Sequence, residues 1–289
     1  MPTNRAAWIN EKCGPVVVDE APMPEPKENE IIVRSHAVAF NPVDGAMFKL
    51  GFITESWPTV IGCDVAGIIS AVGSAVTRFK PGDRVTACID QPNDRANKGA
   101  FQLYCAAYEA LAAKLPDDVS FTNGCVLPLG LCTAAASLFQ TANLGLPLPK
   151  IDVEPQGKVV VVWGGSSSVG SCGIQMAKAA GFEVATTCSG HNIQHCKDIG
   201  ADHVFDHTKE TVVEDILKAL KGQESAGVFD AIMAADTLVK CAEIAHRLGG
   251  KKHLATVLVG PPTPQVVPEG LPEDVEVSYC KRRALEVLW

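Results

Sequence analysis

The second half of the chain alternates between short apolar segments and longer amphipathic ones, and this alternation restricts the fold more than any other feature. The apolar segments are the expected strands: Val159–Trp163, Glu183–Thr187, Val204–Phe205, Phe229–Ala234, His253–Val259 and Val275–Tyr279. The expected helices lie between them: Val169–Ala180, Ile193–Ile199, Val212–Leu220 and Leu238–Leu248. Strands and helices that alternate in this way form a parallel sheet with helices on both faces. The sequence therefore predicts a doubly wound α/β domain over residues 151–289.

The first half of the chain has a different pattern. Short runs typical of strands, such as Ile31–Val33, Val65–Val72 and Arg84–Ala87, are separated by turns rich in proline and glycine. Short strands with this turn chemistry suggest an irregular antiparallel barrel. We therefore expect a first domain over residues 1–150, and the proline-containing stretch Leu144–Gln156 is expected to connect the two halves.

The composition excludes several classes of protein. The 289 residues are 47% hydrophobic and 20% charged, which is typical of a packed globular protein and not of a disordered chain. The net charge of −8 argues against a nucleic-acid partner, because phosphate binding needs clustered Lys and Arg. No apolar segment approaches the roughly 20 residues that span a bilayer, and the N-terminus lacks the apolar core of a signal peptide. We therefore expect no membrane association.

The eleven cysteines are scattered singly, without a CxxC pair, and their number is odd. This distribution indicates buried thiols in a reducing compartment and not a disulfide framework. We therefore expect a cytoplasmic protein.

The glycine-rich segment after the first expected strand of the second half is the strongest local motif. A strand, a glycine turn and a helix together present free backbone N–H groups and the positive end of the helix, which suits a pyrophosphate. The pattern G-x-G-x-x-G would need glycines at 165, 167 and 170, but Ser167 occupies the middle position. The context favours a phosphate-binding turn, and a tight corner without a ligand is the alternative.

The end of the second expected strand bears on the choice between NADH and NADPH. An NADH site needs an acid there to bind the ribose 2′-hydroxyl, but Glu183 stands at the beginning of the strand. The segment Thr186–Asn192 carries hydroxyls, an imidazole and an amide, without a carboxylate that would repel a 2′-phosphate. This favours NADPH, and an ordinary polar loop is the alternative.

Several segments in a fixed order resemble a known family. They are "AVAFNPVDGAMFK" from Ala37, "GCDVAGIISAVGSAVTRFKPGDRV" from Gly62, "GAFQLYCAA" from Gly99, "LPLGLCTAAASLF" from Leu127 and "VVVWGGSSSVGSCGIQMAKAAG" from Val160, followed by "TTCSGHN" and "GADHVFDH". Together they resemble the zinc-free branch of the medium-chain dehydrogenase/reductase superfamily. More narrowly, they are similar to the trans-acting enoyl reductases of fungal polyketide synthases. The resemblance extends from about Ala6 to Gly250.

The resemblance implies a GroES-like β-barrel catalytic domain followed by a Rossmann domain. It implies NADPH-dependent reduction of an α,β-unsaturated polyketide thioester, carried by a polyketide synthase, in secondary-metabolite biosynthesis, and we expect a monomer. The implied cofactor contacts are Val43, Asp44, Gly45, Ala46, Ser166, Ser167, Ser168, Val169, Ser189, Gly190, His191, Asn192 and His207. The implied substrate-lining residues are Ala134, Ala135, Ala136, Ser137, Leu138, Phe139, Gln140 and Thr141.

The chain departs from the family pattern at three places. Ala46 replaces a frequent lysine, so one charged cofactor contact is absent or comes from Lys49. His207 replaces a frequent tyrosine and keeps a flat hydrogen-bonding ring. The chain stops at Trp289, so the return of the family's C-terminal segment to the catalytic domain is expected to be missing.

No metal is expected, although many relatives hold zinc. Catalytic zinc takes three Cys, His or acidic ligands. Cys63 and Asp64 occupy the place of one ligand pair, but the segment "NPVD" has no cysteine, and the match through Thr133 aligns Leu129, and not Cys132, with the remaining ligand. A serine hydrolase is not expected either, because no G-x-S-x-G motif is present.

Two residues have competing interpretations. Thr133 is the candidate donor to the developing negative charge on the thioester oxygen, and a structural role at the start of a helix is the alternative. Asp230, placed at the start of the fourth expected strand, is interpreted as a structural or capping residue. Two other functions stay open, namely an NADPH:quinone or alkenal reductase and a catalytically inactive NADPH-binding subunit that docks to a synthase.

Overall fold

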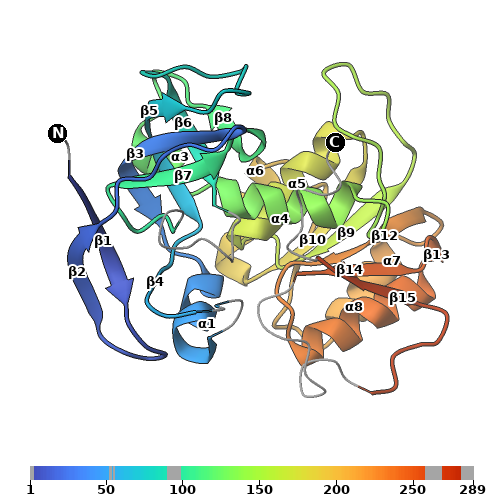
Figure 1. The fold of residues 1–289 in the computed structure, drawn as a ribbon. Coiled ribbons are helices and arrows are strands. Elements are labelled where there is room, and N and C mark those ends of the chain that lie inside the picture. Colours follow the sequence, from blue (N-terminus) through green and yellow to red (C-terminus); the bar gives the residue numbers. More distant parts are fainter. Residues whose placement is uncertain (1–2, 52–53, 55, 90–98, 258–268, 281–289) are drawn as a thin grey trace. The chain divides into compact units, whose positions relative to one another are not determined.

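The structure is a computed structural model and describes residues 3–51, 54, 56–89, 99–257 and 269–280 (Figure 1). The chain divides into two compact units, Met1–Leu129 and Gly130–Trp289. The division falls inside a helix, whereas the sequence analysis placed a boundary after residue 150. The assignment of separate roles to residues 1–150 and 151–289 stays a prediction. The expected missing C-terminal return concerns the chain end, and residues 281–289 lie outside the described part.

The first unit is built from two antiparallel sheets. The five-stranded sheet has the order β7-β3-β5-β6-β8, and the three-stranded sheet has the order β2-β1-β4. The strands are β1 (Asn4–Ile9), β2 (Val16–Ala21), β3 (Glu30–Ala39), β4 (Thr59–Val60), β5 (Asp64–Val72), β6 (Arg84–Cys88), β7 (Tyr104–Tyr108) and β8 (Ala112–Lys114). The helices are α1 (Pro42–Leu50), the 3-10 turn η1 (Glu109–Leu111) and α3 (Phe121–Gly124). The expected β-rich first domain is thus confirmed.

The core of the first unit lies on the inner faces of β3 and β5. Ile31, Val33 and Val65 are fully buried there, because alternate side chains of a strand point to the same face. Gly67 lets the two strands approach closely, since a Cβ at this position would collide with the backbone carbonyl of Arg34. This sheet is the scaffold on which the start of α1 is placed.

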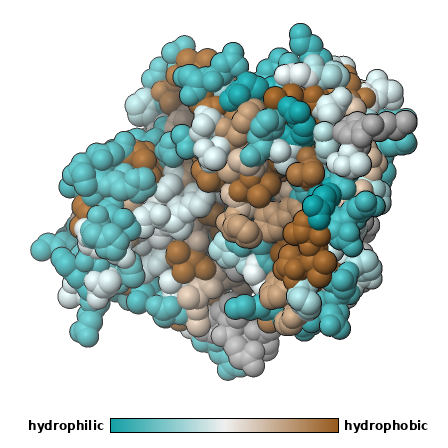
Figure 2. All heavy atoms as spheres, turned by 90° about the vertical axis from the view of Figure 1, so that its left-hand side faces the viewer, coloured by the Kyte–Doolittle hydropathy of each residue, from teal (hydrophilic) through white to brown (hydrophobic). Residues whose placement is uncertain are grey.

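Strand β2 lies at the edge of the three-stranded sheet and exposes apolar side chains. Val16, Val17 and Val18 are 55%, 41% and 60% exposed. Figure 2 views the side on which Figure 1 places β1 and β2, and it shows apolar side chains at the surface among hydrophilic ones. Strand β2 therefore contributes less to the core of the unit than β3 and β5 do.

The second unit contains a seven-stranded sheet in which all paired strands are parallel. Its strands are β9 (Val159–Trp163), β10 (Glu183–Cys188), β11 (His203–Asp206), β12 (Glu224–Asp230), β13 (Gly249–Gly250), β14 (His253–Thr256) and β15 (Glu276–Tyr279). Its helices are α4 (Pro128–Phe139), which begins at the boundary, α5 (Ser168–Ala179), η2 (Gly190–Asn192), α6 (Ile193–Asp198), α7 (Val212–Ala219) and α8 (Ala235–Arg247). The predicted alternation of strands and helices is confirmed, although Leu258 and Val259 of the expected fifth strand lie outside the described residues.

The order of the strands in this sheet is that of a dinucleotide-binding fold. The sheet runs β11-β10-β9-β12-β14-β15, and β13 pairs with β12. Without β13, this is the order 3-2-1-4-5-6 of the Rossmann fold, in which the direction of winding changes between the first and fourth strands. The change falls here between β9 and β12, and ligands of such sheets bind at the carboxyl ends of the strands beside that point.

Strand β9 separates two helical layers. Val160 and Val162 belong to one buried cluster with residues of α4, α5 and α6. Val159, Val161 and Trp163 belong to the other, with residues of α7 and α8. Every side chain of β9 is therefore buried, which is why the strand is a continuous apolar run in the sequence.

The fourth strand differs from the expectation, because β12 ends at Asp230 and does not extend over Phe229–Ala234. The Asp230 carboxylate accepts hydrogen bonds from the backbone N–H groups of Ile232 and Met233 at 3.0 and 3.2 Å. Met233 adopts a positive φ of 57°, so the chain turns there. Asp230 is thus at the end of the strand and not at its start, and its structural role as a capping residue is confirmed.

One stretch of the described chain is long and apolar enough to cross a membrane by length and composition. It spans Phe121–Phe139, 19 residues, and includes α4. The expectation that no segment approaches this length was therefore wrong. Ala134 and Leu138 of α4 are fully buried in a cluster of the second unit, and core helices of soluble proteins pass the same test.

The thiols have the burial that their scattered positions predict. All eleven cysteines are free, eight are buried, Cys132 and Cys280 are half-buried, and Cys13 is exposed. Free cysteines are among the residues most often buried, where they pack as small apolar groups.

Replacing Phe229 by alanine should lower the free energy of unfolding by about 3–5 kcal/mol, because a fully buried aromatic ring is lost from the core of the second unit. Val239→Ala, on the exposed side of α8 in the same unit, should change it by less than about 0.5 kcal/mol. Urea denaturation followed by circular dichroism measures both. Similar small losses in the two variants would contradict the described core.

Candidate active site

The turn between β9 and α5 is hydrogen-bonded to the end of β10. The N–H of Gly164 donates to the Thr187 hydroxyl at 3.1 Å, and the N–H of Gly165 donates to the Thr187 carbonyl at 2.8 Å. Gly164 has a positive φ of 81°, which few other residues adopt without strain. These contacts place the turn at the carboxyl edge of the sheet, at the point where the winding direction changes.

The two glycines that match the dinucleotide pattern leave no room for a side chain. A Cβ at Gly165 would collide with the side chain of Thr186. A Cβ at Gly170 would collide with the backbone of Gly164 and Gly165. The first and third glycines of the pattern therefore have their usual roles, the tight turn and the close packing of helix on strand.

Ser167 explains how the turn forms without the middle glycine. Its backbone is extended, and its hydroxyl accepts a hydrogen bond from the Gly170 N–H at 3.0 Å, as the N-cap of α5. The side chain thus folds back onto its own helix. Among the described residues, the N–H groups of Ser168 and Val169 have no acceptor. They are the free donors of the helix N-terminus, which attracts anions.

The end of β10 and the end of β11 meet at the same edge. Ser189 follows β10, His207 follows β11, and the serine hydroxyl lies 3.2 Å from His207 Nε2. The turn η2 carries Gly190, His191 and Asn192 beside them, with the glycine and the histidine exposed. The structure therefore brings together the predicted contacts around residues 189–192 with His207. Their role toward a cofactor stays a prediction.

A carboxylate that was not expected from the sequence lies at this edge. Asp206, the last residue of β11, lies so close to Gly190 that a Cβ there would be 3.0 Å from Asp206 Oδ2. Its other oxygen accepts hydrogen bonds from the Thr208 N–H and hydroxyl at 3.0 and 2.8 Å. These bonds lower the pKa of Asp206 below its usual value, so the side chain is charged at neutral pH. The end of β10 itself has no acid, as expected, but its neighbour supplies one.

Thr133 is an interior residue of α4. The helix begins at Pro128, so the alternative role of Thr133 at a helix start was wrong. Its carbonyl accepts hydrogen bonds from the Ser137 hydroxyl at 3.0 Å and from the Cys280 thiol at 3.8 Å. These contacts fix the backbone of α4 at this position, and the Thr133 side chain is half-buried.

The predicted substrate-lining stretch is only partly accessible. Five of its residues are buried within the second unit: Ala134, Ala136, Ser137, Leu138 and Gln140. Ala135 and Phe139 are half-buried and Thr141 is exposed. The alternation follows from helical periodicity, since one side of α4 packs on the core. A substrate-lining role, which stays a prediction, therefore concerns the accessible residues of the stretch.

The start of α1, in the first unit, carries the other predicted cofactor contacts. Asp44 is buried and accepts a hydrogen bond from the Asn41 N–H at 2.8 Å, which closes the first turn of the helix. Val43 and Ala46 are half-buried and Gly45 is exposed. Asp44 therefore holds the helix start, and its neighbours are the accessible groups. Lys49, considered as a substitute for the missing lysine at Ala46, is exposed in the last turn of α1.

The residues at the zinc-ligand positions come together around Asp64. Asp64 Oδ2 accepts a hydrogen bond from Asn41 Nδ2 at 2.9 Å, and Oδ1 accepts one from the Leu129 N–H at 2.8 Å. Cys63 is buried in an apolar cluster that includes Met47 and is packed against by Leu129. An amide and an aliphatic side chain thus occupy two of the positions. The described residues contain no group of three or more potential metal ligands, so this donor set does not suit zinc.

Burial of Asp64 raises the pKa of its carboxyl to about 6, and the nearby Asp44 charge adds to the rise, while the hydrogen bonds from Asn41 and Leu129 oppose it. The native state therefore holds a proton here that the unfolded chain releases from about pH 4 upward. Stability from this site is present below that pH and is lost as the pH rises to about 6.

Asp64→Asn should remove this pH dependence, because an amide stays neutral and Asn41 can turn its oxygen toward it. Between pH 4 and 6, the free energy of unfolding of the wild type should fall by about 3 kcal/mol relative to that of the variant. This follows from about 1.4 kcal/mol for each unit of the pKa shift. Urea denaturation at several pH values measures the difference. Parallel pH profiles for the two proteins would contradict an elevated Asp64 pKa.

Comparison with known proteins agrees with this geometry. Residues 27–117 match the family described as alcohol dehydrogenase GroES-like domain, and residues 168–269 match the one described as zinc-binding dehydrogenase. The chain is 43% identical over 279 residues to dehydrogenase pigH of Monascus ruber, with 94% of this chain and 74% of that protein aligned. It is 40% identical over 222 residues to trans-enoyl reductase himH of Aspergillus japonicus, with 76% of this chain and 64% of that protein aligned.

Solved structures give the same result. A mycobacterial protein solved in complex with NADPH is 26% identical, with a TM-score of 0.69 over 96% of this chain and 80% of that one. The order of strands, the glycine turn and the similarity along both units agree with one another. The chain belongs to the medium-chain dehydrogenase/reductase family and is an oxidoreductase.

Proposed function

We propose that the protein is a trans-acting enoyl reductase that uses NADPH to reduce an α,β-unsaturated thioester carried by a polyketide synthase. The observation that carries the proposal is the open N-terminus of α5, with the free N–H groups of Ser168 and Val169 beside the polar ends of β10 and β11. Trans-enoyl reductases among the relatives support the reaction and the synthase partner. Free, buried thiols are consistent with a cytoplasmic enzyme, and we expect a monomer.

The glycine turn fits a dinucleotide, because its two crowded glycines allow the tight turn and the close packing of α5, and the Ser167 side chain folds back onto its own helix. Residues 166–169 would hold the pyrophosphate, and Ser189, His191, Asn192 and His207 would hold the adenosine end. Val43, Gly45 and Ala46 of α1 would contact the same cofactor. When bound, NADPH supplies a hydride to the β-carbon of the substrate.

The chain itself would stabilise the negative charge that develops during the reaction. Negative charge builds on the thioester oxygen as the β-carbon is reduced, and a fixed donor beside that oxygen lowers the barrier. The Thr133 hydroxyl is the proposed donor, because the hydrogen bonds at its own carbonyl hold its backbone in place. Water supplies the proton that the α-carbon takes up, so one hydride and one proton saturate the double bond.

The direct test is oxidation of NADPH by the purified protein with crotonyl and 2-methylcrotonyl thioesters, with NADH in parallel. Turnover with NADPH and both thioesters is the expected result. Turnover only with free quinones or alkenals would replace the proposal with that activity, since quinone oxidoreductases also share this fold. Cofactor binding without any turnover would favour a docking subunit without catalytic activity.

Thr133→Val should lower kcat by about 100-fold and leave KM within about twofold, because the lost hydroxyl acts on charge that develops only in the transition state. Thr133→Ser keeps the hydroxyl and should keep most of the activity. Steady-state kinetics with crotonyl thioester measures both variants. Equal losses in the two would show that Thr133 acts through packing alone.

Asp206→Asn should strengthen binding of NADPH relative to NADH by about three- to tenfold, because a charge beside Gly190 no longer repels the 2′-phosphate. The amide oxygen can still accept the bonds from Thr208. Fluorescence titration with each cofactor gives the ratio. An unchanged ratio would mean that the 2′-phosphate lies away from residues 189–192.

A further inference from the structure

A cavity of about 620 Å³ lies within the first unit, between β1, β3, α1 and the segment around Phe101. Its walls are aliphatic and aromatic, and include Ala7, Ile9, Phe40, Phe48, Ile61 and Phe101. Pockets of this size with mostly apolar walls are typical of small-molecule sites. None of the residues predicted from the sequence as substrate-lining belongs to it.

The polar side chains of the cavity are Asn41 and Asp44, and both take part in hydrogen bonds at the start of α1. Asn41 donates through its backbone to Asp44 and through its side chain to Asp64. Asp44 is 3% exposed, and its Oδ2 accepts the hydrogen bond from the Asn41 N–H. An occupant therefore finds apolar surface and little hydrogen-bonding capacity, which suits a hydrocarbon.

The position of the cavity links it to the proposed chemistry. Asp44 and Gly45, at its edge, belong to the stretch proposed to contact the cofactor. Phe40 and Phe101 both line the cavity, and their ring centroids lie 4.8 Å apart. Phe40 is 83% exposed. A large aromatic side chain exposed to this degree leaves apolar surface that a ligand could cover.

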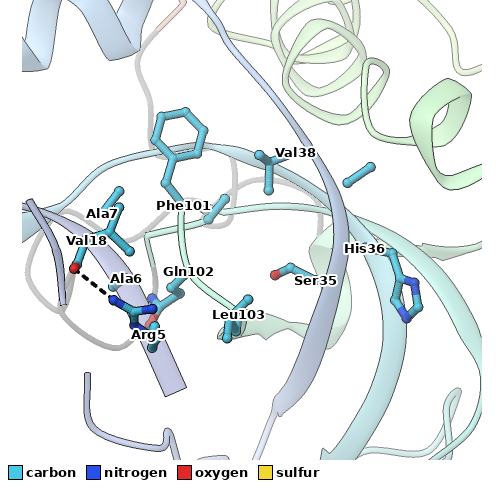
Figure 3. Close-up of a pocket in the computed structure, with 12 residues that line it drawn as sticks. Arg5, Ala6, Ala7, Val18, Ser35, His36, Val38, Phe101, Gln102 and Leu103 are labelled. Atoms are coloured by element: carbon cyan, nitrogen blue, oxygen red, sulfur yellow. Dashed lines mark hydrogen bonds between the residues drawn. The ribbon is translucent and has the colours of Figure 1, made fainter. Parts of the chain in front are cut away.

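A neighbouring recess of about 380 Å³ has a different character (Figure 3). It shares Ala7, Val38 and Phe101 with the cavity, but Arg5 and Gln102 also line it. The guanidinium of Arg5 donates to the Val18 carbonyl at 3.1 Å, shown as a dashed line in Figure 3. The Gln102 side chain accepts a hydrogen bond from Asn4 Nδ2 and donates one to the Gly99 carbonyl. The two spaces thus share lining residues, and the walls of the larger one are the more apolar.

We infer that the cavity of the first unit binds the hydrocarbon chain of the acyl thioester and sets the chain length that the enzyme accepts. The inference rests on the proposed function, because the reacting double bond must lie beside the cofactor contacts at Gly45. The carbons beyond the double bond then extend between Phe40, Phe48 and Phe101. Burial of the apolar surface of the ligand and of these rings favours binding.

The first experiment measures binding of saturated acyl-pantetheines, which cannot react, by calorimetry in the presence of NADPH. Ala7→Leu narrows the cavity and should weaken octanoyl-pantetheine about tenfold, the effect of keeping about two methylene groups out of an apolar environment. Butyryl-pantetheine should bind as it does to the wild type. Ala113→Leu makes the same change on the exposed side of β8 and should alter neither ligand.

The second experiment measures kcat/KM for crotonyl and 2-octenoyl thioesters with the same variants. Selective loss of the longer substrate in Ala7→Leu is the expected result, and Val38→Phe, which narrows the cavity from β3, should repeat it if Ala7→Leu unfolds. Equal changes for both chain lengths, no change, or the same loss in Ala113→Leu would overturn the inference.

The two proposals fail separately. If the wild type reduces no enoyl thioester but Ala7→Leu still weakens octanoyl-pantetheine selectively, the cavity assignment stands and the enoyl reductase proposal falls. If the wild type reduces enoyl thioesters but neither Ala7→Leu nor Val38→Phe changes the chain-length preference, the enoyl reductase proposal stands and the cavity assignment falls. Absence of acyl-pantetheine binding to the wild type would also overturn the cavity assignment.

Discussion

The close packing of α5 on the turn after β9 depends on the missing side chain at Gly170. The backbone of Gly164 and Gly165 occupies the space that a Cβ would need. This contact sets the distance from helix to strand and directs the N-terminus of α5 toward the edge where β10 and β11 end. The Ser167 cap and the hydrogen bond from the Gly164 N–H to the Thr187 hydroxyl hold the turn in the same place. The anion site is therefore a product of backbone geometry more than of particular polar side chains.

Buried carboxylates hold the loops on which each unit depends. In the second unit, Asp230 accepts bonds from two backbone N–H groups and from the hydroxyls of Thr237 and Thr256, and so ends β12 beside the glycine turn. In the first unit, Asp64 joins the start of α1 to the start of α4. Each carboxylate accepts hydrogen bonds from N–H groups outside its own strand. A positioning role for acids is thus common to both units, although their sequences share no repeat.

Hydrophobic periodicity predicted most of the fold, and it did so where side chains of one segment decide the structure. The runs from Val159 to Trp163 and from Val65 to Val72 are strands because of their own composition. The end of β12 was missed because it depends on a carboxylate that binds N–H groups two and three residues further along. The Asp206 carboxylate was missed as a neighbour of Gly190 because strand order, and not chain distance, brings them together. The accessible side of α4 could not be predicted from the sequence either, because the residues on every side of this helix are apolar or small.

The alternation of side chains along β9 has a consequence for how this sequence can vary. Val160 and Val162 face only the layer of α4, α5 and α6, while Val159, Val161 and Trp163 face only the layer of α7 and α8. Neighbouring side chains of one strand therefore pack against different helices, and the volume allowed at each position depends on different parts of the chain. Among homologues, a change of volume at Val162 should be matched by changes on α5, and one at Val161 by changes on α8. Two independent patterns of covariation should thus be interleaved, residue by residue, within five consecutive positions.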